Sequence, residues 1–433
     1  MSSPPVLLSR RRLLGAAAAL GLVGALGPLS GCSRSVSISD DPNELVLWYW
    51  TRSISPTLLA QAAEQIPGTT KRLRADVIGG TFDTKLRTSL AGGAYIPDIT
   101  AINSNCALYF TNEDKFLDLN EFGAEKFKPE FFDWKWQLGT TPTGRFCFWP
   151  MDTGPTGLYY REDLFEKAGL PSDPTKVSAA IKTWDAFLEL GSKLRTDSDI
   201  ALISNATVIF NQYLNASPER YFDSQDQPLY SKPDSAVRQA WDTAVEAIQS
   251  KVTGNLQTST DQNSAWVSGK LAGHIEAVWW AETLADTAPD TKGLWRLASQ
   301  PVRPGNSGGS FLAVPSTSKD PQAAFAFVSW LTTPDNQALT FNDVQLFPST
   351  PASFTSGKMK SETRFFGTQD PLDFFSKAAE EVPTTFVSTY ESQVTAFTTE
   401  ITNVEAIGKD PEQAWDEAVE LTDRILAKRG VIA

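Results

Sequence analysis

Histidine, cysteine and methionine are scarce in this chain of 433 residues, which has one histidine, three cysteines and three methionines. None of them has the spacing of metal ligands, and neither a Gly-rich phosphate loop nor a Gly-x-Ser-x-Gly elbow is present. The single histidine, His274, leaves little room for a nucleophile and its base. We therefore expect no metal, no cofactor and no catalytic residue, and we interpret His274 as a structural side chain.

An excess of basic side chains is also missing. The chain has 38 Lys and Arg against 51 Asp and Glu, a formal net charge of −13. Nucleic-acid binding needs clusters of basic residues to neutralise phosphates, and none is visible. Acidity favours solubility and suits an uncharged ligand at least as well as an anionic one. Nucleic acid is thus excluded as a partner, and the absence of internal repeats argues against an adhesion module.

The first 32 residues have the pattern of an export signal. Three arginines at 10–12 precede an apolar run over 13–29 that four glycines interrupt, which is too short and glycine-rich for a permanent membrane span. Leu29-Ser30-Gly31-Cys32 is similar to a lipobox; an ordinary cleaved signal with an incidental cysteine is the alternative. We predict a twin-arginine lipoprotein signal peptide at 1–31, a lipid on Cys32 and a flexible tether over 32–42. The protein would then be anchored to the outer face of the cytoplasmic membrane.

Without residues 1–31, 35 basic side chains face 51 acidic ones, a net charge of about −16. Some 400 residues exceed what one core usually supports, so two lobes are expected. The N-terminal region alternates strands, at 45–50, 73–77 and 97–102, with helices, at 56–66 and 82–91. Such alternation predicts a parallel sheet, whose ligands collect beyond the carboxyl ends of the strands. Trp50, Asn103 and Asn105 follow strands in this way.

A crossing between elements is predicted at 150–157, because two prolines and two glycines cannot lie inside a regular strand. Trp149, Asp152 and Thr153 lie at this crossing. A short strand over 158–160 and a helix over 163–168 follow, and Gly169 is placed to end the helix.

This stretch resembles a motif of the bacterial extracellular solute-binding proteins of sugar importers. Tyr159-Tyr160-Arg161-Glu162-Asp163-Leu164-Phe165 and Ala168-Gly169-Leu170 are similar to the family's L-[FY]-Y-N-x-D-L-F-x-x-A-G-L run, although Arg161 replaces its Asn. Further similar segments occur in the expected order, at 85–99, 183–187, 269–280, 304–310 and 347–351. In the family, the segment corresponding to 269–280 ends with a tryptophan at the cleft, and the segment corresponding to 304–310 is a second crossing, which returns the chain to the first lobe. The segment at 347–351 looks like a third crossing.

The resemblance implies an α/β, two-lobed periplasmic-binding-protein-like fold, in which each lobe is a doubly wound, mostly parallel sheet flanked by helices. It places 43–151 and 309–350 in an N-terminal lobe and 155–305 and 353–433 in a C-terminal lobe, with the ligand cleft between them. It also implies a monomer that captures a sugar or oligosaccharide and delivers it to the permease subunits of an ABC transporter and their ATPase.

A sugar ring offers an apolar face and a hydroxyl rim, so its site needs aromatic platforms beside carboxylates and amides. We assign Trp50, Asn103, Asn105, Trp149 and Asp152 to the N-terminal wall and Trp279 and Trp280 to the opposite wall, with Thr153 and Ser310 at the crossings. Trp48 and Trp295, inside predicted strands, are assigned to the core.

Two points stay open from the sequence. A secreted glycoside-active enzyme needs only two carboxylates, for which Asp152 with Glu276 or Glu282 are candidates. Cys106 and Cys147 could form a disulfide or remain two buried thiols, because spacing alone does not decide between these states.

Overall fold

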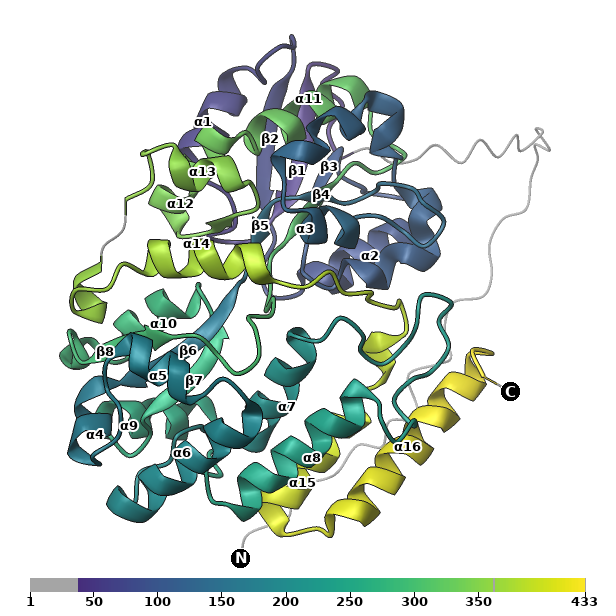
Figure 1. The fold of residues 1–433 in the computed structure, drawn as a ribbon. Helices are drawn as coiled ribbons and strands as arrows, with labels where there is room; N and C mark the ends of the chain where they lie inside the picture. Colours follow the sequence, from purple (N-terminus) through teal and green to yellow (C-terminus); the bar gives the residue numbers. More distant parts are fainter. Residues whose placement is uncertain (1–37, 361–362, 433) are drawn as a thin grey trace, which may run out of the picture. The chain divides into compact units, whose positions relative to one another are not determined.

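A five-stranded sheet forms from the alternating strands of the N-terminal region and two later segments. The computed structural model describes residues 38–360 and 363–432 (Figure 1); the predicted signal peptide, Cys32 and most of the tether lie outside them. The strand order is β2-β1-β3-β9-β4, and β1 is parallel to both β2 and β3. β9 is antiparallel to β3 and β4, so it returns the chain to this sheet from a distant part of the sequence. The strands are β1 (Glu44–Tyr49), β2 (Arg72–Val77), β3 (Ile99–Ile102), β4 (Trp149–Pro150) and β9 (Phe311–Ala313).

Helices pack against this sheet, and their apolar residues share its hydrophobic core. They are α1 (Pro56–Glu64), α2 (Phe82–Gly92), α11 (Pro321–Leu331) and the short α3 (Asp133–Leu138), with the 3-10 helices η1 (Cys106–Lys115), η2 (Leu119–Phe122) and η3 (Ala124–Glu130). The predicted strands and helices of the N-terminal region are thus confirmed, with ends that differ by one or two residues.

A second sheet has three strands in the order β7-β6-β8. These strands are β6 (Thr156–Arg161), β7 (Gly273–Ala277) and β8 (Trp295–Ala298). Both neighbours of β6 run antiparallel to it, so the prediction of a mostly parallel sheet is wrong for these strands. Parallel pairing is limited here to isolated bridges such as Ala201 with Leu271. The error has a simple cause, because an apolar run reports that both faces are covered and not which way the neighbouring strand runs.

Most of the helices lie in the part of the chain that carries the second sheet (Figure 1). Before β8 they are α4 (Glu162–Lys167), α5 (Pro174–Ala180), α6 (Trp184–Ser198), α7 (Ala206–Asn215), α8 (Ala236–Gln249), α9 (Ser259–Ser268), α10 (Trp280–Thr287) and η4 (Pro289–Thr291). After β9 and α11, α12 (Pro334–Val344) contacts α1 and α11 beside the first sheet. It is followed by α13 (Pro351–Thr355), η5 (Thr363–Phe366), α14 (Pro371–Glu381), η6 (Glu391–Gln393), α15 (Ala396–Ile407) and α16 (Pro411–Lys428).

Capping residues set several helix ends as predicted. The Thr183 side chain accepts from the backbone N–H of Ala186 at 3.2 Å, and Asp320 caps α11 with Pro321 in its first turn. Gly169, just beyond α4, has φ +67°, the left-handed conformation that ends a helix. Such N-caps typically contribute about 1 kcal/mol each, so the local sequence favours helix starts at these positions.

The crossings between the two sheets lie side by side. β5 (Asp152–Thr153) pairs antiparallel with β10 (Phe347–Pro348), and the Thr153 hydroxyl donates to the Pro348 carbonyl at 2.9 Å. The 306–308 segment joins them, since the Gly154 N–H donates to Asn306 Oδ1 at 2.9 Å. A Cβ added to Gly154 would lie 2.1 Å from the Ser307 carbonyl oxygen, so the close approach of the crossings requires glycine here.

Four hydrophobic clusters make up the core. One belongs to the first sheet and two to the helices around the second. The remaining cluster brings Phe341 and Phe347 together with Tyr159 and Trp280, so apolar contacts continue across the crossings. The described residues form one compact unit, and none of their helices has the length and apolar character needed to cross a bilayer.

Candidate functional site

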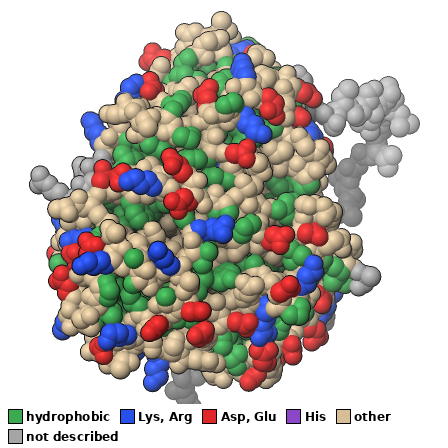
Figure 2. All heavy atoms as spheres, viewed as in Figure 1, with side chains coloured by type: hydrophobic (Ala, Val, Ile, Leu, Met, Phe, Trp, Pro, Cys, Tyr) green, Lys and Arg blue, Asp and Glu red, His purple; other side chains and the backbone are tan. Residues whose placement is uncertain are grey.

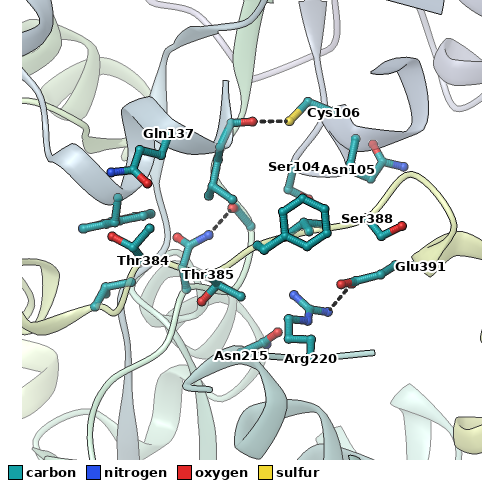
Figure 3. Close-up of a pocket in the computed structure, with 18 of the residues that line it drawn as sticks. Ser104, Asn105, Cys106, Gln137, Asn215, Arg220, Thr384, Thr385, Ser388 and Glu391 are labelled. Atoms are coloured by element: carbon teal, nitrogen blue, oxygen red, sulfur yellow. Dashed lines mark hydrogen bonds and ion pairs between the residues drawn. The ribbon is translucent and has the colours of Figure 1, made fainter. Parts of the chain in front are cut away.

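The main candidate site is a cavity of about 520 Å³, which lies within the usual range of ligand pockets. We call it the main cavity. Segments far apart in the sequence line it, and Figure 3 shows Ser104 and Asn105 facing Asn215 and Arg220 across it. Its lining comes from residues 104–110, 134–140, 215–220, 306–308 and 382–392.

Several polar groups of the main cavity come from residues at or just beyond the ends of helices and strands. The buried strand β3 stops at Ile102, so Asn103, Ser104 and Asn105 emerge at the carboxyl edge of the first sheet and are exposed. Asn215 is the last residue of α7, and the segment after α14 adds Thr384 and Thr385. Amides and hydroxyls can both donate and accept, so this lining suits a ligand rich in hydroxyl groups.

Arg220 and Glu391 are the only charged side chains among the described residues that line the main cavity. They pair with each other, with Arg220 Nη2 3.1 Å from Glu391 Oε2 (Figure 3). Burial raises the pKa of Glu391, and the charge of Arg220 opposes that rise. Arg220 Nε and Glu391 Oε1 are buried and have no hydrogen-bond partner among the described residues.

Trp279 is the exposed aromatic side chain beside this cavity. It keeps 42% of its surface exposed, and its Nε1 donates to the Ser307 carbonyl at 3.1 Å. A Cβ on Gly308 would lie 3.4 Å from the same nitrogen, so the indole edge rests on the 306–308 segment that lines the main cavity. Phe110 and Phe386, both half-buried, add aromatic surface to the lining.

Two further cavities are lined partly by the same residues as the main cavity or by their neighbours in the sequence. One, of about 520 Å³, is lined by Trp50, Asn103, Asp83 and the 78–82 turn, and Trp50 packs edge-on against Phe82 at 5.1 Å between ring centres. We call it the β1–β3 cavity.

The other, of about 230 Å³, shares Asn215, Arg220 and Ser307 with the main cavity and also contains Glu276. We call it the α7 cavity. Burial raises the pKa of Glu276, and hydrogen bonds oppose that rise.

Of the predicted site residues, Trp50, Asn103 and Asn105 line cavities, and Trp279 lies beside one. Trp149 and Trp280 do not, and the prediction that they form platforms is wrong. Trp149 is fully buried among aromatic rings of the first sheet's core and donates to the Thr332 hydroxyl at 2.7 Å. Trp280 is only 4% exposed and packs against Trp266. Periodicity did not distinguish these rings, because a tryptophan at the first residue of an element, as Trp149 is in β4 and Trp280 in α10, gives the same signal whether it faces the core or solvent.

Asp152, Thr153 and Ser310 are also buried, at the crossings. Asp152 Oδ1 accepts from the Ser310 N–H at 2.8 Å and from its hydroxyl, so these side chains hold two crossings together. The prediction that Asp152 belongs to the ligand wall is therefore not supported by its placement. Lys135 lies close by, with Nζ 3.4 Å from the centre of the Phe311 ring.

Burial dominates the electrostatics at this point. It lowers the pKa of Lys135 to about 8, and the charge of Asp152 opposes that shift. Burial likewise raises the pKa of Asp152. Each charge therefore partly compensates the other in a region that excludes water.

The candidate carboxylate pair is not assembled. Asp152 is buried at the crossings, Glu276 lines the α7 cavity, and Glu282 forms an ion pair with Arg52. None of them lines the main cavity. Within the described part of the chain, no group of three or more His, Cys, Asp or Glu side chains is placed to hold a metal ion.

The remaining titratable candidates are structural. Cys106 and Cys147 are free and buried, which decides between the two states that the sequence left open. Burial raises the pKa of each thiol to about 12. Burial also lowers the pKa of His274 to about 3, and the ring packs between Trp266 and Trp280.

Sequence reasoning missed several lining residues, namely Gln137, Asn215, Arg220, Thr384, Thr385, Phe386 and Glu391. None belongs to a motif, since they lie in or beside loops that only the tertiary structure brings together. One available signal was the polar run that follows Pro383 between two helices, because loops on a rigid scaffold often carry binding residues.

Comparisons with known proteins agree with this arrangement. Residues 73–338 match the sequence profile of the bacterial extracellular solute-binding proteins. The lactose-binding protein of Rhizobium radiobacter is 27% identical over 309 residues, which cover 66% of this chain and 69% of that protein.

Two solved structures are similar over most of the chain. A crystal structure of an extracellular solute-binding protein of family 1 has a TM-score of 0.82 and 26% identity, covering 88% of this chain and 99% of that one. The sugar-binding protein MalE of Xanthomonas citri has a TM-score of 0.74 and 17% identity, covering 89% and 98%, which is a likeness of fold alone.

Proposed function

Because this chain belongs to the bacterial extracellular solute-binding proteins, we propose that the solute it binds is a sugar or oligosaccharide, captured for an ABC importer. The fold is the α/β periplasmic-binding-protein-like fold of MalE-type structures. The protein is exported, and it is a binding protein and not an enzyme, so the alternative of a glycoside-active enzyme is set aside.

One observation carries the sugar assignment. The main cavity combines amide and hydroxyl side chains with the exposed ring of Trp279 at its 306–308 edge. A pyranose needs both, because its C–H face stacks on an aromatic ring while its hydroxyls exchange hydrogen bonds with amides. The relative from Rhizobium radiobacter is a lactose-binding protein, which makes lactose one ligand to test.

Capture would proceed by closure of two lobes, one with 43–151 and 309–350 and the other with 155–305 and 353–433. Separate sheets and the paired crossings β5 and β10 support this division. A ligand that touches Asn105 after β3 and Trp279 before α10 contacts both lobes. Closure is then favoured by the contacts that the ligand makes only in the closed state.

Delivery requires partners at the membrane. The family implies two permease subunits and an ATPase, which the lobe surfaces would approach. The lipobox-like Leu29-Ser30-Gly31-Cys32 supports a lipid on Cys32. Cys32→Ser should leave the protein unprocessed or release it into the medium. Unchanged partition into the membrane fraction would exclude the lipid anchor.

A thermal-shift screen of the purified protein tests the sugar assignment. The panel contains glucose, galactose, lactose, maltose, galactobiose and maltotriose, each at increasing concentration. A ligand at 100 times its Kd should stabilise the protein by about 2.7 kcal/mol. Calorimetric titration then gives the affinity of each hit. If no saccharide stabilises the protein while the fold is intact, the proposed function is refuted.

A further inference from the structure

We infer that Arg220 and Glu391 set the charge preference of the site, so that it selects uncharged saccharides and rejects acidic ones. The inference rests on the proposed function and adds a specificity determinant to it. It follows from where the two side chains lie, from what else lines the cavities, and from the hydrogen-bonding chemistry of the ligand.

Arg220 occupies the junction of two cavities. It lines both the main cavity and the α7 cavity, which meet at Asn215, Arg220 and Ser307. No other Lys or Arg among the described residues lines either of them or the β1–β3 cavity. Any acidic sugar that entered this region would therefore depend on this one guanidinium for a cationic partner.

Glu391 already forms an ion pair with that guanidinium. The two side chains are 23% and 10% exposed, and their closest atoms are 3.1 Å apart. Local hydrogen bonds fix the backbone at Glu391. Its N–H donates to the Ser388 carbonyl, and the Ser388 hydroxyl donates to Asp226. The remaining charged side chains of the three cavities are Glu276 and Asp83, both acids. An anion in the main cavity would thus meet a cation that is already paired, and the acidic side chains of the two other cavities would repel it, the more so in a region of low dielectric.

Hydroxyl groups match this pair and carboxylates do not. Arg220 Nε is a donor and Glu391 Oε1 an acceptor, and both lack a partner among the described residues. A hydroxyl can accept from the first or donate to the second. An ionised carboxylate can only accept, so it leaves Glu391 unsatisfied and places two negative charges together. Discrimination through a missing donor of this kind can be large in a buried site.

The competing view is that the pair only braces the loop after α7 against η6. Such a brace would affect the stability of the protein but not the preference of the site for neutral over acidic ligands. The test therefore measures a ratio of affinities, which a structural role does not move.

The protein is titrated at low salt with neutral saccharides and, separately, with their acidic counterparts. The neutral set is glucose, galactose, lactose and galactobiose, and the acidic set is glucuronate, galacturonate, lactobionate and digalacturonate. Wild type is expected to bind at least one neutral saccharide, with its acidic counterpart at least tenfold weaker. Glu391→Gln exposes the charge of Arg220, so the ratio of neutral to acidic affinity should fall by at least tenfold. Glu412→Gln is the matched control, because Glu412 pairs with Arg238 on the surface, away from all three cavities. It should leave the ratio unchanged.

A second variant protects the test against misfolding. The exchange Arg220→Glu with Glu391→Arg keeps one charge of each sign, and it should keep the preference for neutral ligands. Equal wild-type affinity for neutral and acidic saccharides, or an unchanged ratio in folded Glu391→Gln, would overturn the inference while leaving sugar binding intact. If wild type bound no saccharide of either charge, the proposed function would fail, and this inference with it.

Discussion

Trp279 offers the sharpest test of the ligand surface. It is the only tryptophan with a large exposed fraction among the described residues, at 42%. A tryptophan side chain buries up to about 250 Å², so roughly 100 Å² remains available to a ligand. At about 25 cal/mol per Å², covering that area contributes at most about 2.5 kcal/mol. Trp279→Ala should therefore weaken sugar binding by about 1–2.5 kcal/mol, or roughly 5- to 70-fold in Kd.

Calorimetric titration with a saccharide from the screen measures this loss directly. Trp279→Phe keeps most of the ring but not the hydrogen bond to Ser307, so it should restore most of the affinity. Trp330→Ala is the matched control, because Trp330 is a half-buried tryptophan of α11 that lines none of the cavities described above. An affinity of Trp279→Ala equal to that of wild type, with the fold intact, would refute the stacking argument and move the aromatic platform to Phe110 or Phe386.

Two further predictions concern the crossings and the buried histidine. Gly154→Ala places a methyl group 2.1 Å from a carbonyl oxygen of the neighbouring crossing, so the free energy of unfolding should fall by roughly 1–3 kcal/mol. Gly92→Ala, where a Cβ meets nothing within 4 Å, should be nearly neutral; equal denaturation midpoints for the two variants would contradict the argument. The pKa of His274 is lowered to about 3, so the folded state loses stability as pH falls below the unfolded value of about 6.5. By pH 4.5 the loss reaches about 2.7 kcal/mol. His274→Phe removes it, so the stability of this variant relative to wild type should rise between pH 7 and 4.5, and parallel curves would exclude the histidine as the cause.

The electrostatics of the crossings show why a carboxylate in a binding motif need not bind the ligand. Asp152 was predicted to be a wall residue because short carboxylates recognise sugar hydroxyls. In the fold it accepts from Ser310 and lies near Lys135, where burial governs both pKa values. A carboxylate in such a place holds two crossings together, so a substitution of Asp152 would act on these crossings and not on a group that lines the main cavity.

The sequence by itself determined the local structure and the family. Helix caps such as Thr183 and Asp320 act within a few residues, as does Gly169 at the end of a helix. They can therefore be recognised from the sequence alone. The β-α-β order of the N-terminal region and the motif at 159–170 indicated the fold for the same reason, since both depend on neighbouring residues.

Only the tertiary structure decided strand direction beside β6, the burial of Trp149 and Trp280, and the pairing of Arg220 with Glu391. The strand pairs and the ion pair join segments more than 100 residues apart in the sequence, and distant residues such as Phe325 and Tyr159 help to cover the two tryptophans. No local pattern encodes these approaches. A strand pattern reports that a side chain is covered, and the identity of the covering residues is fixed only when distant segments pack. The residues that line the main cavity lie mostly in loops, where periodicity is absent, so only the tertiary structure shows that these loops surround one cavity.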